Sequence, residues 1–106
     1  MSEGEVETLI RAYISLLKSS GIPIDKVFLF GSYARGEATS ESDIDIMLIS
    51  SFFDSPNLEL KAQVWGLTRK VDTRIEPYII GMKRFMLDDG SPLLQIVKQE
   101  GKEIIA

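Results

Sequence analysis

The chain of 106 residues carries a formal net charge of -4, and 44% of its residues are hydrophobic and 26% charged. This size and composition predict one globular domain, residues 1–106, with one hydrophobic core and no separate substrate-binding unit. A negative net charge repels a phosphate backbone, so we expect no autonomous binding to duplex DNA. The sequence has no cysteine and no histidine, which excludes thiolate nucleophiles, Cys/His zinc sites and histidine acid–base catalysis.

Two features of the sequence bear on where the protein works. No apolar run approaches the roughly 20 residues that cross a bilayer. The first five residues, Met1-Ser2-Glu3-Gly4-Glu5, are acidic, whereas a secretory signal begins with basic residues. We therefore expect a cytoplasmic protein with no membrane partner.

The first half of the chain predicts a helix followed by two strands. Ser2 and Glu5 form a capping-box pattern ahead of apolar residues at helical spacing. The apolar run 26–30 is bounded by Gly31 and predicts a buried strand. After a small, polar loop, residues 43–49 are rich in β-branched side chains and predict the second strand.

A second helix is predicted after these strands. Ser55 as N-cap and Pro56 at the first helical position open it, and it runs to about Lys70. Five of its apolar residues are expected to be buried: Leu58, Leu60, Val64, Trp65 and Leu67. In the connection before it, Phe52 and Phe53 either lie under the sheet, which we favour, or form an exposed docking patch.

Residues 71–80 resume a β-type pattern and predict a third strand. Alternation places Asp72, Arg74 and Glu76 on one side of this strand. Pro77 cannot donate a hydrogen bond to a ladder, so the strand lies at an edge of the sheet or ends there.

The last segment repeats the helix-opening signal at Ser91 and Pro92, and this helix is expected to run through Gln99. A short strand at 103–105 is a further expectation. The order helix, strand, turn, strand, helix, strand, helix predicts an α/β (α+β) fold in which helices flank a small mixed sheet.

The residues that carry chemistry lie between 31 and 45, where Gly31-Ser32-Tyr33-Ala34-Arg35-Gly36 is followed by Ser42-Asp43-Ile44-Asp45. Asp43 and Asp45 are two apart on a strand, so their carboxylates project from one face, about 6.5 to 7 Å apart along the backbone. Like charges this close repel unless a proton or cation intervenes, and a pair of divalent ions is the usual resolution. Carboxylates suit hard cations such as Mg²⁺ or Mn²⁺.

The turn before these carboxylates suits a phosphate group. Gly31 allows close approach to the backbone, and the Ser32 hydroxyl can donate to a phosphate oxygen. Arg35 is either a further phosphate contact or a surface arginine. Each motif by itself is better explained as a turn or a solvated strand face, but the two together, at the predicted ends of two strands, favour a site.

The pattern G-S-x-A-x-G, a short spacer and S-D-I-D resembles the signature of the DNA polymerase beta-like nucleotidyltransferases. The closest similarity is to their stand-alone branch, the minimal nucleotidyltransferases. The resemblance implies a nucleotidyltransferase fold, three acidic residues and two divalent ions. It also implies transfer of a nucleoside monophosphate from a nucleoside triphosphate to a hydroxyl, with pyrophosphate leaving.

This resemblance implies a third carboxylate on a neighbouring strand, and two residues qualify. Residues 69–75 read basic, basic, apolar, Asp, x, Arg, apolar, which is similar to the polymerase branch and favours Asp72 over Glu76. By resemblance, Asp43, Asp45 and Asp72 are then the catalytic metal ligands. Arg74 offers another explanation, in which Asp72 is half of a surface ion pair.

The leading functional hypothesis is transfer of AMP from ATP to a hydroxyl of another molecule. Members of the minimal branch often act beside a small helical HEPN protein as the antitoxin of a toxin–antitoxin pair, and the resemblance extends this expectation to the present chain. The alternative is a non-catalytic binding module that neutralises a partner by covering its surface. Self-association into a homo-oligomer is a further way to supply the surface that a small chain lacks.

Overall fold

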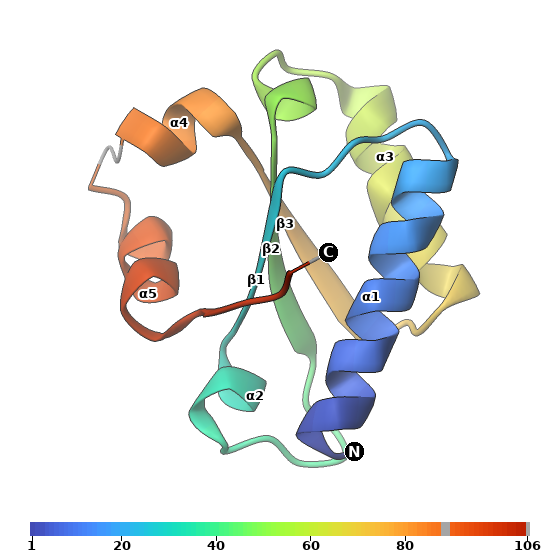
Figure 1. The fold of residues 1–106 in the computed structure, drawn as a ribbon, viewed down its shortest axis with the longest axis vertical. Coiled ribbons are helices and arrows are strands. Elements are labelled where there is room, and N and C mark those ends of the chain that lie inside the picture. Colours follow the sequence, from blue (N-terminus) through green and yellow to red (C-terminus); the bar gives the residue numbers. More distant parts are fainter. Residues whose placement is uncertain (88–89, 106) are drawn as a thin grey trace.

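The computed structural model describes residues 1–87 and 90–105, and it has one four-stranded sheet with helices on both faces (Figure 1). The strand order is β3-β2-β1-β4. Strand β1 (Lys26–Phe30) is antiparallel to β2 (Ile44–Ser50) and to β4 (Lys102–Glu103), while β2 is parallel to β3 (Ile75–Gly81). This mixed sheet confirms the predicted fold class.

One face of the sheet is covered by α1 (Glu3–Ser19) and α3 (Leu58–Leu67) (Figure 1). The predicted capping box of α1 is confirmed: the Glu5 N–H donates to Ser2 Oγ at 3.2 Å, and the Ser2 N–H donates to Glu5 Oε1 at 3.2 Å. The buried side chains on this face include Ile10, Tyr13, Ile14, Val27, Leu29, Ile44, Ile46, Leu48, Val64 and Ile75.

The other face is covered by α4 (Met82–Leu87) and α5 (Pro92–Glu100) (Figure 1). A second buried cluster lies there, made of Phe30, Met47, Ile49, Ile80, Leu94 and Val97. Successive residues of β2 alternate between the two clusters, which explains why this strand is an almost continuous apolar run rather than a half-polar one. The sequence pattern missed α4.

The third strand begins later than predicted. Residues 71–73 do not pair with β2, because residues 68–70 form a 3-10 turn and the Asp72 N–H donates to Thr68 O at 2.9 Å. The first bond to β2 is made by Arg74 O, which accepts from the Ile44 N–H at 2.8 Å. The Arg74 N–H then donates to Asp72 Oδ1 at 2.9 Å. These local bonds replace strand pairing, so β3 starts at Ile75. The expectation that Pro77 marks an edge strand is confirmed, since β3 ends the strand order.

Helix α3 also differs from the prediction. Its N-cap is Asn57, whose Oδ1 accepts from the Leu60 N–H at 3.0 Å, and not Ser55. Of the five residues expected to be buried, only Val64 is fully buried, and Leu58 and Trp65 are 84% and 39% exposed. The helix therefore keeps apolar side chains on its outer surface.

The two phenylalanines before α3 also differ from the interpretation that both lie under the sheet. Phe52 is 51% exposed, whereas Phe53 is half-buried against the first cluster. Among the described residues, no helix is both long and apolar enough to cross a membrane.

The Tyr13 hydroxyl offers a test of the packing between α1 and α3. It is fully buried and donates to Val64 O at 2.6 Å. We expect Tyr13→Phe to lower the free energy of unfolding by about 1–2 kcal/mol, because it removes a buried hydrogen bond. Tyr33→Phe is the matched control, since the Tyr33 hydroxyl makes only a 3.5 Å, exposed contact with Thr39 O. Equal urea midpoints for the two variants would contradict this packing.

Candidate active site

The site is built where β1 gives way to α2 (Ser32–Arg35). Gly31 caps this short helix with φ 76° and ψ -152°, a backbone conformation that favours glycine. Its carbonyl accepts from the Ala34 and Arg35 N–H groups, both at 3.1 Å. The residue before the bend, Phe30, pairs with Asp45 across the β1–β2 ladder. The register thus brings the two predicted motifs to the same end of the sheet.

Asp45 lies directly against the α-carbon of Gly31. A Cβ built on Gly31 would collide with Asp45 Oδ2 and would lie 3.2 Å from Asp45 Cγ. Two independent features therefore require glycine at this position: its φ is positive, and the Asp45 carboxylate occupies the space that a side chain would need.

Glu76 completes an acidic cluster with Asp43 and Asp45. It pairs with Asp45 in the parallel β2–β3 register, so both side chains leave the same face of the sheet. Asp43 precedes β2 by one residue and is exposed, whereas Asp45 and Glu76 are half-buried. The structure thus brings together Asp43, Asp45 and the alternative third carboxylate.

The electrostatics of this cluster oppose full ionisation. Burial raises the pKa of Asp45 above its ordinary value, and the charge of Asp43 raises it further, although Glu76 and Arg35 oppose the shift. Burial also raises the pKa of Glu76, as do its hydrogen bond with Asp45 and the charges of Asp43 and Asp45. Asp45 and Glu76 are therefore both harder to ionise than free carboxyl groups.

Asp72, the predicted third carboxylate, has a different environment. It lies in the turn before β3 and holds Arg74 through two bonds, from Nε to Oδ1 at 3.0 Å and from Nη2 to Oδ2 at 2.7 Å. The hydrogen bonds from Arg74 hold the pKa of Asp72 below its usual value. The local contacts of Asp72 are those of an ion pair, and its metal-binding role stays a prediction.

The predicted phosphate contacts also differ in their surroundings. Ser32 is half-buried and directly follows the Gly31 bend. Arg35 donates from Nε to Glu37 at 3.0 Å and from Nη1 to Glu100 at 3.1 Å. The bond to Glu100 joins α2 to α5, and together the two bonds occupy two of the five N–H donors of Arg35.

Tyr78 belongs to this site and was missed in the sequence. It lies two residues after Glu76 on the same face of β3, and its ring packs edge to face on Phe30 with centroids 5.2 Å apart. Burial raises the pKa of Tyr78, and the charges of Glu76, Asp45 and Asp43 raise it further. The signal that could have identified Tyr78 is the alternation of side chains along a strand, which places residues 76 and 78 on one face.

The donor set fits a hard divalent cation. Asp43, Asp45 and Glu76 offer only carboxylate oxygens, the ligands that Mg²⁺ and Mn²⁺ accept, and their mutual repulsion would be relieved by a cation. Within residues 1–87 and 90–105, however, no three acidic side chains are already arranged to hold a metal ion. Binding would therefore require side-chain rotation in this cluster.

The sequence matches the family model described as the nucleotidyltransferase domain over residues 10–100. The chain belongs to this family. The match confirms the resemblance found in the sequence, and the bend, the paired aspartates and strands β1, β2 and β3 all lie within the matched residues.

Relatives of known sequence share a shorter segment. Two proteins of Methanocaldococcus jannaschii, both named provisionally as protein adenylyltransferases, are 50% and 48% identical to this chain over 44 residues. These segments cover 41% and 42% of this chain and 44% and 43% of the relatives. The matched parts thus span less than half the length of either relative.

Solved structures extend the likeness to nearly the whole fold. A toxin–antitoxin structure with AMP-PNP is 27% identical, with a TM-score of 0.63 over 94% of this chain and 73% of that one. A toxin–antitoxin MntA-HpeT variant is 26% identical, with a TM-score of 0.60 over 91% and 71%. A nucleotidyltransferase of Sulfolobus solfataricus, provisionally so named, is 18% identical with a TM-score of 0.63 over 95% and 80%, and supports the fold only.

The contact between Gly31 and Asp45 predicts a specific effect of substitution. We expect Gly31→Ala to lower nucleotidyl transfer at least about tenfold, because the new methyl group displaces a carboxylate from its working position. Gly36→Ala is the matched control: Gly36 has φ 73° but nothing within 4 Å of an added Cβ. Both variants share a strain of about 1–2 kcal/mol from the positive φ, measurable by thermal unfolding. Similar activities of the two variants would contradict the role of the contact.

The raised pKa of Asp45 predicts a pH-dependent stability. When folding raises the pKa of an acid, the free energy of unfolding falls as the pH rises above the acid's ordinary pKa, which is 3.8 for an aspartate. We expect Asp45→Asn to raise the Tm of the metal-free protein by a few degrees at pH 7, with the gain shrinking toward pH 4. Glu41→Gln removes the same charge from an exposed loop position and serves as control. A gain that is independent of pH would refute this electrostatic origin.

Proposed function

We propose that the chain transfers AMP from ATP to a hydroxyl of a partner protein, with Mg²⁺ or Mn²⁺ as a two-ion cofactor. The observation that carries the proposal is the packing of Asp45 against the Gly31 bend with Glu76 opposite. It joins an acidic cluster and a glycine–serine turn at one end of the sheet. The reaction needs a site that accepts cations and a triphosphate together, and these two features offer both.

The roles of the acidic residues follow from their surroundings. Asp43 and Asp45 would hold the divalent ions, and we place Glu76 as the third carboxylate because it faces Asp45 in the register. Asp72, which the resemblance favours, is the competing assignment. Bound cations would neutralise the charge of the phosphates and of the leaving pyrophosphate. Positioning and charge neutralisation then supply most of the catalysis.

The nucleotide would bind at the turn. Gly31 leaves the backbone open to a phosphate, Ser32 can donate its hydroxyl, and Arg35 could release Glu37 or Glu100 for a phosphate oxygen. The AMP-PNP named for the toxin–antitoxin neighbour supports an adenine nucleotide as substrate. A reaction that consumes ATP belongs in the cytoplasm.

The acceptor in this proposal is a protein hydroxyl. The names of the two Methanocaldococcus relatives support protein adenylylation, and the toxin–antitoxin neighbours support a partner protein. From the resemblance seen in the sequence, we infer a small helical HEPN-type toxin as partner and an antitoxin role for this chain.

Label transfer tests the function directly. We expect the chain, ATP labelled at the α-phosphate and Mg²⁺ or Mn²⁺ to label the product of the neighbouring gene and to release pyrophosphate. The Asp43→Asn, Asp45→Asn double variant should lose this labelling. If neither ion gives labelling, or if the double variant still neutralises the partner in cells at normal abundance, the chain acts by binding and the proposal fails.

Two single variants decide which residue is the third carboxylate. We expect Glu76→Gln to lower label transfer by about two orders of magnitude or more, since it removes a proposed ligand of a catalytic metal. Asp72→Asn should lower it less than about tenfold while weakening the ion pair with Arg74. Initial rates at saturating ATP provide the comparison. The reverse order of the two effects would restore Asp72 as the ligand.

A further inference from the structure

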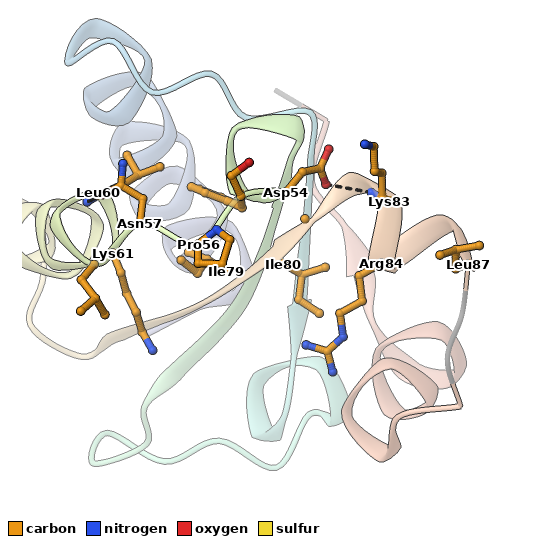
Figure 2. Close-up of a pocket in the computed structure, with 14 residues that line it drawn as sticks. Asp54, Pro56, Asn57, Leu60, Lys61, Ile79, Ile80, Lys83, Arg84 and Leu87 are labelled. Atoms are coloured by element: carbon orange, nitrogen blue, oxygen red, sulfur yellow. Dashed lines mark hydrogen bonds between the residues drawn. The ribbon is translucent and has the colours of Figure 1, made fainter.

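A groove of about 610 Å³ lies at the opposite end of the sheet from Asp45 (Figure 2). Helices α3 and α4 form its two walls, and Ile79, Ile80 and Gly81 of β3 lie between them. The strand register separates the two sites, because Asp45 pairs at the start of β2 whereas Gly81 pairs with Ser50 at its end. The groove is thus distinct from the acidic cluster.

Exposed apolar side chains gather around this groove. Leu58 on one wall is 84% exposed and Leu87 on the other is 81% exposed, so both leave large apolar surfaces in contact with water. Phe52 and Met86, on the elements that flank the opening, are 51% and 69% exposed. Such a concentration of large apolar residues marks an interaction surface rather than the scattered exposure of an ordinary surface.

The groove is basic, although the chain as a whole is acidic with a net charge of -4. Three cations, Lys61, Lys83 and Arg84, and one carboxylate, Asp54, are among the described residues that line it. Figure 2 shows Lys61 and Arg84 extending to the same side from opposite walls, past Ile79 and Ile80. Lys61 on α3 and Lys83 on α4 offer an acidic ligand positive charge from both walls.

Asp54 has a structural role that leaves this basic character in place. Its Oδ1 accepts from the Lys83 N–H in the first turn of α4 at 3.0 Å, and its Cα would lie 3.0 Å from a Cβ built on Gly81 (Figure 2). The carboxylate is thus directed at the backbone of α4 and fixes that wall relative to β3.

We propose that this groove docks an acidic amphipathic helix of a partner protein. An apolar floor between two helical walls suits the apolar stripe of a helix, and the flanking cations suit carboxylates beside that stripe. A nucleic acid fits less well, because bases stack on aromatic rings and the residues between the two walls, Ile79 and Ile80, are aliphatic. The inference goes beyond the proposed nucleotidyl transfer and does not depend on it.

A labelled peptide tests the docking. The probe is a helical peptide of about 16 residues with leucines at i, i+4 and i+7 and glutamates between them, and the comparison peptide has lysines in place of the glutamates. We expect the acidic peptide to bind the wild-type chain and the basic peptide to bind at least about tenfold more weakly. Amide shifts in nuclear magnetic resonance spectra should change at Lys61 and Gly81 and stay unchanged at Gly31.

Matched variants separate docking from general surface effects. We expect Lys61→Glu and Leu58→Asp each to weaken binding about tenfold, as loss of charge or of an apolar anchor implies. Both positions lie in the first turns of α3, where an acidic residue is compatible with the helix. Lys18→Glu and Ile105→Asp, which change an exposed lysine and an exposed isoleucine outside the groove, should bind as the wild type does.

Several results would overturn the inference. The first three are no binding of the acidic peptide, equal binding of both peptides, and normal binding of the acidic peptide to Lys61→Glu. The fourth is that a single-stranded oligonucleotide displaces the peptide and that Lys61→Glu weakens the binding of this oligonucleotide. Asp45→Asn should bind the peptide normally even when it fails to transfer AMP. Failure of docking and failure of nucleotidyl transfer are thus separate results.

Discussion

The proposed chemistry of this chain depends on one contact, the Asp45 carboxylate held against the α-carbon of Gly31 and paired with Glu76 on the neighbouring strand. The contact joins a turn that can accept phosphate to a strand that carries acid, so neither motif is positioned without the other. It also confines like charges in a half-buried place, which raises the pKa values of Asp45 and Glu76. The charge of Arg35 lowers the pKa of Asp45, but Arg35 is shared with Glu37 and Glu100 and only partly offsets this repulsion. A site of this kind favours the arrival of positive charge, which is the physical basis of the proposed role for a divalent cation.

Strand directions explain why the acidic residues converge. Strands β2 and β3 are parallel, so both begin at the same end of the sheet, and the antiparallel β1 finishes at that end. Asp45, Glu76 and the Gly31 bend therefore meet although they are separated along the chain. Strands β2 and β3 finish at the opposite end of the sheet, where α4 begins and the groove lies. One sheet thus separates an acidic end from a basic end.

Much of this arrangement could be predicted from the sequence, and the failures have physical reasons. The apolar run before Gly31, the β-branched segment 43–49 and the capping box predicted β1, β2 and the first helix, because these signals are local. Alternation also placed Asp72 and Glu76 on one face, but it could not choose between them, since the strand register depends on contacts distant in sequence. The bonds around Asp72 then form a turn where a strand was expected. The exposure of Leu58 was unpredictable for a similar reason: helical spacing shows which residues share a face, and the neighbouring elements decide how much of that face is covered.

Helix α3 is only partly covered by the rest of the molecule. Val64 packs on the sheet and accepts the Tyr13 hydroxyl, while Leu58 and Trp65 face outward from the same ten-residue helix. A helix that is apolar on more sides than its own sheet can cover is stabilised by a further surface. The basic groove beside Leu58 specifies the charge of that surface, and its distance from the Gly31 bend leaves the nucleotide end accessible. A partner docked there would leave the Gly31 bend and the acidic cluster uncovered, because these lie at the other end of the sheet.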